Sequence, residues 1–521
     1  MNERAAAPPQ GAAGVEKLAL IGFMGAGKST AARQLGVAGA DVDQVIERRT
    51  GRKLAEIFAN DGEPAFRELE ERITVELLTD PQVRVVSLGG GALGSAKVRA
   101  ALKREARAVW LDIEVDDAWE RVGSGNGHNR PLARDRARFN ELFRVRRPHY
   151  EAAADVIVPA GRAERIVKII ESLEDLPDGA KVLWARTGSG DYPVYIGAGL
   201  ITEHRFWPSH LKGRRVLISD HNVAGRYEQL FEPLLADLRI TPGEQSKTLA
   251  SAEMIWTELA RKGVTRSELA VAFGGGVVGD LAGFCAASYQ RGIGVVQVPT
   301  TLVAQVDSAY GGKTGIDLPE AKNYVGAFHQ PQAVLVDTAM LASLPKAELA
   351  AGYAEVVKTA LIAGGSLWER VRSGAPADDQ GVIAGCALTK LRVVAQDEHD
   401  GGQRQLLNLG HTVGHALETV TGYARYRHGE AVALGLLAAL RLSGADQLRD
   451  EVEELLLVAG LPTVVDPLID VDDVLTAVQR DKKRLGEGPV PFVLCPEPGG
   501  CIYGQQIDHQ QLRAAIVELY Q

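Results

Sequence analysis

Short apolar runs alternate with helical patterns over the first third of the chain. The runs have the length of buried strands and lie at residues 17–23, 83–88, 108–113 and 155–158. Between and after them, apolar side chains recur at the helical spacing at residues 29–35, 64–78 and 162–173. Strands that alternate with helices form parallel sheets. The pattern predicts an α/β domain with a parallel sheet over residues 17–175.

The alternation breaks and then restarts. Pro177, Asp178 and Gly179 are breakers, and they predict a linker over residues 176–180. Extended segments follow at residues 182–186, 192–197, 215–219, 269–273 and 294–298, which indicate a second, Rossmann-like α/β part over residues 181–344. Beyond it, amphipathic stretches rich in Ala and Leu lie at residues 346–363, 382–396, 408–420 and 430–442. They predict an all-helical domain over residues 345–521.

Composition excludes several classes of protein. A formal net charge of −9 over 521 residues argues against nucleic acid as the main partner. No apolar stretch is long enough to span a bilayer, and residues 1–16 read as a disordered leader without the apolar core of a signal peptide. The four cysteines form no C-x-x-C pair. We expect a cytoplasmic protein of several domains that binds neither membrane nor nucleic acid.

Residues 22–30 read GFMGAGKST and fit the pattern G-x-x-x-x-G-K-[ST] directly after an apolar run. In such a loop the glycines turn backbone N–H groups towards one point, the lysine reaches phosphate, and the hydroxyl meets Mg²⁺. This predicts a site for ATP with Mg²⁺, with Ser29 as a metal ligand. Its residues are Gly25, Ala26, Gly27, Lys28, Ser29 and Thr30.

A set of glycines and arginines follows that would suit an anionic substrate. The predicted strand 83–88 runs into Gly89, Gly90 and Gly91, where a ligand can approach the backbone closely. No aspartate stands there for the metal, so Asp41 and Asp43 both remain candidates. Guanidinium groups suit carboxylate and phosphate, and the candidates are Arg67, Arg130 and Arg146, with Arg130 in a Gly-rich lid.

These motifs together resemble shikimate kinase over essentially all of residues 17–175. The resemblance implies that Asp43 holds and activates the acceptor hydroxyl, and that Arg67 and Arg146 clamp the substrate carboxylate beside the glycine triplet. It also implies that Arg130 closes over the transferring phosphates and that Asp41 assists Mg²⁺. The lid departs from the family in Pro-Leu-Ala-Arg, where a second Leu is usual. A degenerate module that binds nucleotide and only regulates the rest of the chain is the alternative.

Two further patterns indicate a second site. Residues 274–280 read GGGVVGD and satisfy G-x-G-x-x-G after a strand, which suits either a dinucleotide or a plain tight turn. The usual acidic residue is missing about 20 residues later, so Asp220 or Asn222 would have to meet a ribose. His411 and His415 lie one helical turn apart, and they join His428 and Glu355 as candidates for a metal site with an open position.

Nearly all of residues 181–521 resembles 3-dehydroquinate synthase, through strings such as PGEQSKT at 242–248, GGKTG at 311–315 and HTVGHA at 411–416. The resemblance implies a divalent metal, Zn²⁺ or Co²⁺, held by Glu355, His411 and His428. It implies NAD⁺ contacts from Asp220, Asn222, Glu244, Lys247, Gly275, Gly276, Val277, Asp280, Thr300, Thr301, Lys313 and Lys322. It implies heptulosonate-phosphate contacts from Arg291, Asp307, Lys313, Asn323, Lys358, Lys390, Arg404, Asn408, His415 and either Lys482 or Lys483.

The family reaction explains why one site needs both cofactors. The resemblance implies conversion of 3-deoxy-D-arabino-heptulosonate 7-phosphate to 3-dehydroquinate with no net redox change. It implies catalytic roles for Lys313, Lys358, Arg404 and His415, the last as the proton-transfer residue, and a homodimer in which Arg291 reaches the partner's site. Asp400 stands where the family tends to have Glu, so its contact would be shorter or lost. A metal-dependent alcohol dehydrogenase of the glycerol dehydrogenase type and a related sugar-phosphate cyclase are the alternatives.

Overall fold

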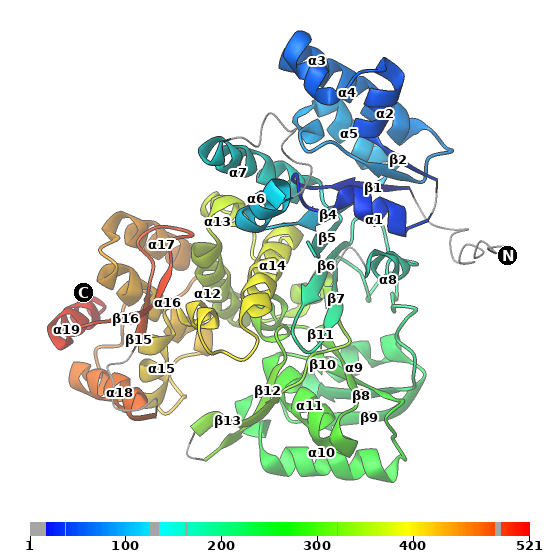
Figure 1. Cartoon of the computed structure of the whole chain (residues 1–521). Helices are drawn as coiled ribbons and strands as arrows, with labels where there is room; N and C mark the ends of the chain where they lie inside the picture. Colours follow the sequence, from blue (N-terminus) through cyan, green and yellow to red (C-terminus); the bar gives the residue numbers. More distant parts are fainter. Residues whose placement is uncertain (1–16, 37, 125–134, 162–164, 320, 485–490) are drawn as a thin grey trace. The chain divides into compact units, whose positions relative to one another are not determined.

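The computed structural model describes residues 17–36, 38–124, 135–161, 165–319, 321–484 and 491–521. The chain divides into two compact units. The first comprises residues up to 185 with 208–210, and the second comprises residues 186–207 and 211–521. Figure 1 colours the first unit from blue to cyan and the second from green to red.

The first unit contains a parallel sheet flanked by helices, as the sequence predicts (Figure 1). Every described pair of its strands is parallel. In sheet order the strands are β2 (Gly39–Asp41), β3 (Val85–Ser87), β1 (Leu18–Ile21), β4 (Arg107–Asp112), β5 (Val156–Pro159) and β6 (Lys181–Arg186). The helices are α1 (Lys28–Gln34), α2 (Val42–Thr50), α3 (Leu54–Asn60), α4 (Gly62–Thr79), α5 (Ala96–Glu105), α6 (Val115–Ser124), α7 (Arg136–Ala153) and α8 (Ile166–Glu171).

The α/β part of the second unit is also built on a parallel sheet. In sheet order its strands are β7 (Asp191–Gly197), β14 (Ala333–Asp337), β11 (Gly294–Pro299), β10 (Leu269–Gly274), β8 (Arg215–Asp220) and β9 (Leu234–Ile240). β10 is buried along its whole length, which explains its unbroken apolar sequence. The remaining elements of this part are α9 (His221–Tyr227), α10 (Leu249–Arg261), α11 (Gly276–Ser288), the π-helix η9 (Ala304–Ser308), and the antiparallel hairpin of β12 (Lys313–Leu318) and β13 (Ala321–Phe328).

After Leu344 the unit becomes helical, as predicted. The helices are α12 (Lys346–Ala363), α13 (Gly365–Arg372), α14 (Gln380–Gln396), α15 (His411–Val420), α16 (His428–Leu442), α17 (Asp446–Val458), α18 (Val471–Arg484) and α19 (His509–Glu518). The prediction of an all-helical part is incomplete, because β15 (Pro491–Leu494) and β16 (Ile502–Gln506) form a hairpin. Both strands are short, and a run of four residues carries too little periodicity to be recognised.

Within the described ranges, no helix combines the length and the apolar character that crossing a membrane requires.

Candidate active sites

The phosphate-loop sequence connects β1 to α1. Gly22 lies where only glycine fits, because its φ is +138° and a Cβ would come 2.7 Å from the carbonyl oxygen of Leu111. Gly27 precedes α1 in the left-handed conformation. Lys28 folds back over the loop, and its Nζ donates to the carbonyl oxygens of Gly22 (2.8 Å) and Phe23 (3.1 Å). The loop therefore presents backbone N–H groups at the start of a helix, where an anion is favoured.

The structure separates the two candidate aspartates. The Ser29 hydroxyl donates to Oδ2 of Asp41 at 2.6 Å. Asp43, the second residue of α2, lies instead near Gly89, since a Cβ at Gly89 would be 3.4 Å from its Oδ1. Asp41 thus contacts the hydroxyl group of Ser29 in the P-loop, and Asp43 lies beside the glycine triplet at residues 89–91.

The glycine triplet faces the predicted arginines. A Cβ at Gly91 would lie 2.7 Å from Cζ of Arg67, and one at Gly90 would lie 3.5 Å from an Nη of Arg146. The Arg67 guanidinium therefore fills the space that a side chain at Gly91 would need, and the Arg146 guanidinium lies in van der Waals range of Gly90. Asp43, Arg67, Arg146 and the triplet at residues 89–91 therefore form one cradle.

Buried charge in this cradle is only partly compensated. Arg67 pairs with Glu70 at 2.6 Å and with Glu63 at 3.0 Å. Burial raises the pKa of Glu70 against the opposing effect of Arg67, and burial lowers the pKa of Arg146. Among the described residues, no carboxylate lies within ion-pair distance of Arg146. The cradle therefore retains a positive group for an anionic ligand. Arg130, the predicted lid arginine, lies outside the described residues.

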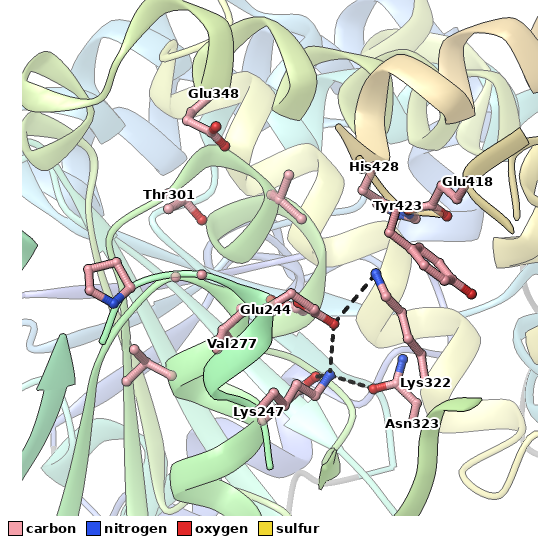
Figure 2. A pocket seen from close by; sticks show the side chains of 18 of the residues that line it. Glu244, Lys247, Val277, Thr301, Lys322, Asn323, Glu348, Glu418, Tyr423 and His428 are labelled. Atoms are coloured by element: carbon pink, nitrogen blue, oxygen red, sulfur yellow. Dashed lines mark hydrogen bonds and ion pairs between the residues drawn. The ribbon is translucent and has the colours of Figure 1, made fainter. Parts of the chain in front are cut away.

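The second unit contains a cavity of about 1760 Å³. Figure 2 shows part of its lining. The predicted NAD⁺ contacts lie in its wall with one exception, Lys313. The predicted NAD⁺ contacts that line the cavity are Asp220, Asn222, Glu244, Lys247, Gly275, Gly276, Val277, Asp280, Thr300, Thr301 and Lys322. Asp307, Asn323, His415 and His428 line the same cavity.

The glycine motif at residues 274–280 forms one wall of this cavity. β10 ends at Gly274, and α11 begins at Gly276. A Cβ at Gly275 would come 3.0 Å from Cγ2 of Thr301, and one at Gly276 would come 3.0 Å from Oγ of Ser308. The turn therefore presents backbone without side chains to the cavity. A turn that only reverses the chain would not need glycine at both of these positions.

A buried lysine connects three segments of this wall. Lys247 Nζ lies 2.6 Å from Oδ2 of Asp280 and donates to Oδ1 of Asn323, and it lies 3.9 Å from Oε1 of Glu244 (Figure 2). Burial lowers the pKa of Lys247, but Asp280 and Glu244 outweigh this effect and hold the pKa above its ordinary value. The network fixes α11, the hairpin and the loop before α10 around one ammonium group.

The predicted metal ligands meet one another, although only His428 of the three is among the residues that line the cavity. Oε1 of Glu355, in α12, lies 3.5 Å from Nε2 of His411 and 3.4 Å from Nε2 of His428. The ligand atoms of all three lie within 4.8 Å of one another. A second set, His415, Glu418 and His428, meets the same criterion.

The chemistry of the first set fits a divalent cation. Both carboxylate oxygens of Glu355 are buried and lack a well-directed hydrogen bond, although Lys358 Nζ lies 2.5 Å from Oε2. Burial opposes ionisation of Glu355, but Lys358 and the two histidines hold its pKa well below the usual range. Burial lowers the pKa of His428, but the carboxylates of Glu355 and Glu418 outweigh this effect and raise the pKa to about 10. A carboxylate and two imidazoles are the donor groups that suit Zn²⁺ or Co²⁺.

Three more of the predicted cations hold partners in the second unit. Lys390 Nζ lies 2.9 Å from Oδ1 of Asp307. Arg404 is 2% exposed and donates to the carbonyl oxygens of Glu398 (2.5 Å) and Gly311 (3.1 Å). The shorter side chain of Asp400 keeps a contact, since its Oδ2 lies 2.5 Å from Nζ of Lys313.

Some predicted residues do not join the cavity wall. Arg291 and Asn408 are exposed and do not line it. The residues that line it also do not include Lys313, Lys358, Lys390 and Arg404. Lys482 and Lys483 belong to α18, but their side chains lie outside what the structure describes.

Several residues that line this cavity were missed from the sequence, and two of them carry charge or an aromatic ring beside the predicted set. Glu418 and Tyr423 both line the cavity (Figure 2). Glu418 lies seven residues after His411 and three after His415, so helical spacing places it on the histidine face and could have identified it. Tyr423 lies in a turn with a φ of 59°, where no periodic signal exists.

A phosphate loop with an arginine-lined cradle is typical of kinases of small anionic substrates, and a glycine turn beside a Glu/His/His cluster is typical of metal-dependent enzymes with a dinucleotide. Comparison with known proteins identifies both classes. Residues 24–174 match the shikimate kinase family, residues 237–351 match the 3-dehydroquinate synthase N-terminal family, and residues 352–484 match the 3-dehydroquinate synthase C-terminal family. The chain belongs to the 3-dehydroquinate synthase family and carries a shikimate kinase domain before it, so it combines two enzymes of the shikimate pathway.

Individual relatives agree with this assignment. The 3-dehydroquinate synthase of Azotobacter vinelandii is 42% identical over 348 residues, which cover 63% of this chain and 94% of the relative. A crystal structure of 2-deoxy-scyllo-inosose synthase complexed with carbaglucose-6-phosphate, NAD⁺ and Co²⁺ is 25% identical. It covers 65% of this chain and 100% of its own, with a TM-score of 0.58. The 2-epi-5-epi-valiolone synthase from Streptomyces hygroscopicus, with NAD⁺ and Zn²⁺ bound, is 24% identical over 63% of this chain and 96% of its own, with a TM-score of 0.57.

Proposed function

We propose that the two sites work as independent catalysts, a shikimate kinase at the P-loop and a 3-dehydroquinate synthase at the large cavity. The observation that carries the proposal is the convergence of residues from distant segments on each site. We place the kinase domain at residues 17–175 and the synthase at residues 181–521, with its helical part beginning at 345, although β6 pairs with β5 in the sheet of the first unit.

In the kinase, phosphoryl transfer needs mainly positioning and charge neutralisation. The P-loop residues 25–30 hold the ATP phosphates, and Ser29 with Asp41 holds Mg²⁺. Arg67 and Arg146 clamp the shikimate carboxylate against the glycine triplet, because Arg146 has no carboxylate partner among the described residues. Asp43 then lies where it can hold the acceptor hydroxyl, and Arg130 is proposed to close over the phosphates.

In the synthase, the wall around the glycine turn holds NAD⁺, and Glu355, His411 and His428 hold Zn²⁺ or Co²⁺. When bound, these groups supply a hydride carrier and a Lewis acid. A structural relative at 25% identity holds NAD⁺ and Co²⁺, which supports this pairing. The carboxylate of Glu355 and the network around Lys247 are already organised to receive them.

The cations near the metal set would orient the substrate. Lys313, Lys358, Lys390 and Arg404 supply positive charge for the phosphate and carboxylate of the heptulosonate, while Asp307 and Asn323 accept or donate to its hydroxyls. His415 lines the cavity one helical turn from His411, so it can move a proton at the reacting carbon or hydroxyl. We propose a cytoplasmic homodimer in which Arg291, exposed on its own subunit, completes the partner's site.

The test is release of phosphate from 3-deoxy-D-arabino-heptulosonate 7-phosphate, measured beside ATP consumption with and without shikimate. We expect a chelator selective for transition metals to abolish phosphate release while Lys28→Ala leaves it intact. We expect Lys28→Ala to abolish shikimate-dependent ATP consumption. Stoichiometric NADH release would instead indicate a dehydrogenase, and a product other than 3-dehydroquinate would indicate a related cyclase. A wild type that consumes no ATP with shikimate would leave the first unit as a binding module.

A further inference from the structure

His428 lies between two buried carboxylates. Its Nε2 is 3.4 Å from Oε1 of Glu355, and its Nδ1 is 3.4 Å from Oε1 of Glu418. The Glu355 side chain is 1% exposed and the Glu418 side chain is 7% exposed. The two carboxylates come from α12 and α15, and His428 is the first residue of α16.

The two nitrogens of one imidazole cannot serve the same purpose here. A neutral imidazole has one N–H donor and one acceptor nitrogen. The nitrogen that faces the Glu355 set must be the acceptor if it is to ligate a cation, so the nitrogen that faces Glu418 carries the proton. In metal sites a carboxylate commonly accepts that N–H and so fixes the tautomer and the ring orientation.

We propose that Glu418 is a positioning residue that accepts the Nδ1–H of His428 and directs Nε2 towards the metal set. The inference rests on the proposed synthase function. Glu418 lines the cavity beside Tyr423, and Figure 2 shows it next to His428. A carboxylate this deeply buried needs a donor, and His428 supplies it.

The alternative is that Glu418 itself ligates a cation with His415 and His428. The two carboxylates differ in a way that argues against this. Both oxygens of Glu355 are buried and lack a well-directed hydrogen bond, and its Oε1 faces Nε2 of both His411 and His428. Glu418 instead faces the opposite ring nitrogen of His428, Nδ1, at 3.4 Å. The Glu355 set therefore brings two imidazole nitrogens to one buried carboxylate with acceptors left for a cation, and this favours it as the metal set.

The experiment measures metal binding by metal-free, full-length protein. Zn²⁺ affinity is determined by competition with a chromogenic chelator, and Co²⁺ binding by its visible absorption spectrum. We compare wild type with Glu418→Gln, Glu418→Ala, Glu418→Asp and Glu355→Gln. Glu348→Gln is the matched control, because Glu348 also lines the cavity but pairs with Arg427.

We expect Glu418→Ala to weaken Zn²⁺ binding by about 10- to 100-fold and to change the Co²⁺ spectrum, since the ring loses its orienting partner. Glu418→Gln keeps a neutral acceptor, so its Zn²⁺ affinity should fall less than that of Glu418→Ala. Glu418→Asp keeps the carboxylate, so its Zn²⁺ affinity should also lie between those of Glu418→Ala and wild type. Glu348→Gln should match wild type. Thermal unfolding of the metal-free variants separates these effects from misfolding.

The outcomes are distinguishable. Wild type that binds no equivalent of Zn²⁺ or Co²⁺ would defeat the proposed synthase site itself. Wild type that binds one equivalent, with Glu418→Ala equal to it in affinity and spectrum, would overturn only the positioning role. A loss in Glu418→Ala as complete as in Glu355→Gln would make Glu418 a ligand, which also overturns it.

Discussion

The ammonium group of Lys322 lies 4.1 Å from the centroid of the Tyr423 ring. Lys322 belongs to the hairpin strand β13, whereas Tyr423 lies in the turn that follows α15. The same ammonium lies 3.8 Å from Oε1 of Glu244 (Figure 2). The aromatic face and the carboxylate thus hold Lys322 at the cavity wall from two sides.

Removal of the Tyr423 ring should therefore weaken NAD⁺ binding. An exposed cation–π contact contributes about 0.5–1 kcal/mol, so we expect Tyr423→Ala to raise the Kd for NAD⁺ about two- to fivefold. Tyr423→Phe keeps the ring and should bind like wild type. Isothermal titration calorimetry with NAD⁺ measures both. Equal losses in the two variants would point to the hydroxyl and refute the ring as the cause.

Lys247 should be needed for stability as well as for cofactor binding. Its side chain is 4% exposed, and Lys247→Met would leave Asp280 and Asn323 without this donor. Such unpaired groups cost about 1–3 kcal/mol, so we expect a lower unfolding temperature of the second unit by calorimetry. Adding Asp280→Asn should restore part of the loss, because it removes the unpaired charge. A double variant no more stable than Lys247→Met would argue against this pairing.

Part of the order of strands and helices could be predicted, where a segment is long enough to show a period. The apolar runs at 269–273 and 294–298 became β10 and β11, and the pattern at 346–363 became α12. Other elements were not predicted, among them β2, β9, α10, the hairpin of β12 and β13 and the hairpin of β15 and β16. In the shortest of these, too few residues are present to show a clear period.

Contacts between side chains from distant segments could not be predicted in the same way. The sequence shows that Ser29 can meet a carboxylate but not which one, and only the folded chain places Asp41 there. Likewise, Glu418 has the helical spacing of His411 and His415, but its partner His428 lies on another helix. Motifs within one segment were readable, whereas contacts between segments depend on tertiary packing.

A side chain at Gly91 should disturb shikimate binding in particular. The Cβ of Gly91→Ala would lie 2.7 Å from Cζ of Arg67, so the guanidinium must move away from the cradle. We expect about a tenfold or greater rise in the KM for shikimate, the cost of about one displaced charged contact, with the KM for ATP unchanged. Gly94→Ala is the matched control, because its Cβ would meet nothing within 4 Å. Steady-state kinetics in both substrates tests this, and a parallel rise in both KM values would contradict it.

Glu268 makes the stability of the second unit depend on pH. Hydrogen bonds from Thr265 and Arg214, at 2.6–3.1 Å, lower the pKa of this carboxyl to about 2. A carboxyl with a depressed pKa stabilises the fold when ionised, fully above its unfolded pKa of about 4.3 and progressively less as pH falls towards 2. Because Arg214 is largely exposed, we expect Glu268→Gln to cost about 1–3 kcal/mol at pH 7, with a smaller deficit at pH 3.5. Urea unfolding of both proteins at pH 7, 5 and 3.5 measures the difference, and Glu258→Gln on the exposed face of α10 should show no such trend. A deficit that stays constant or widens towards acid would show that the ionised carboxylate is not what stabilises this corner of the sheet.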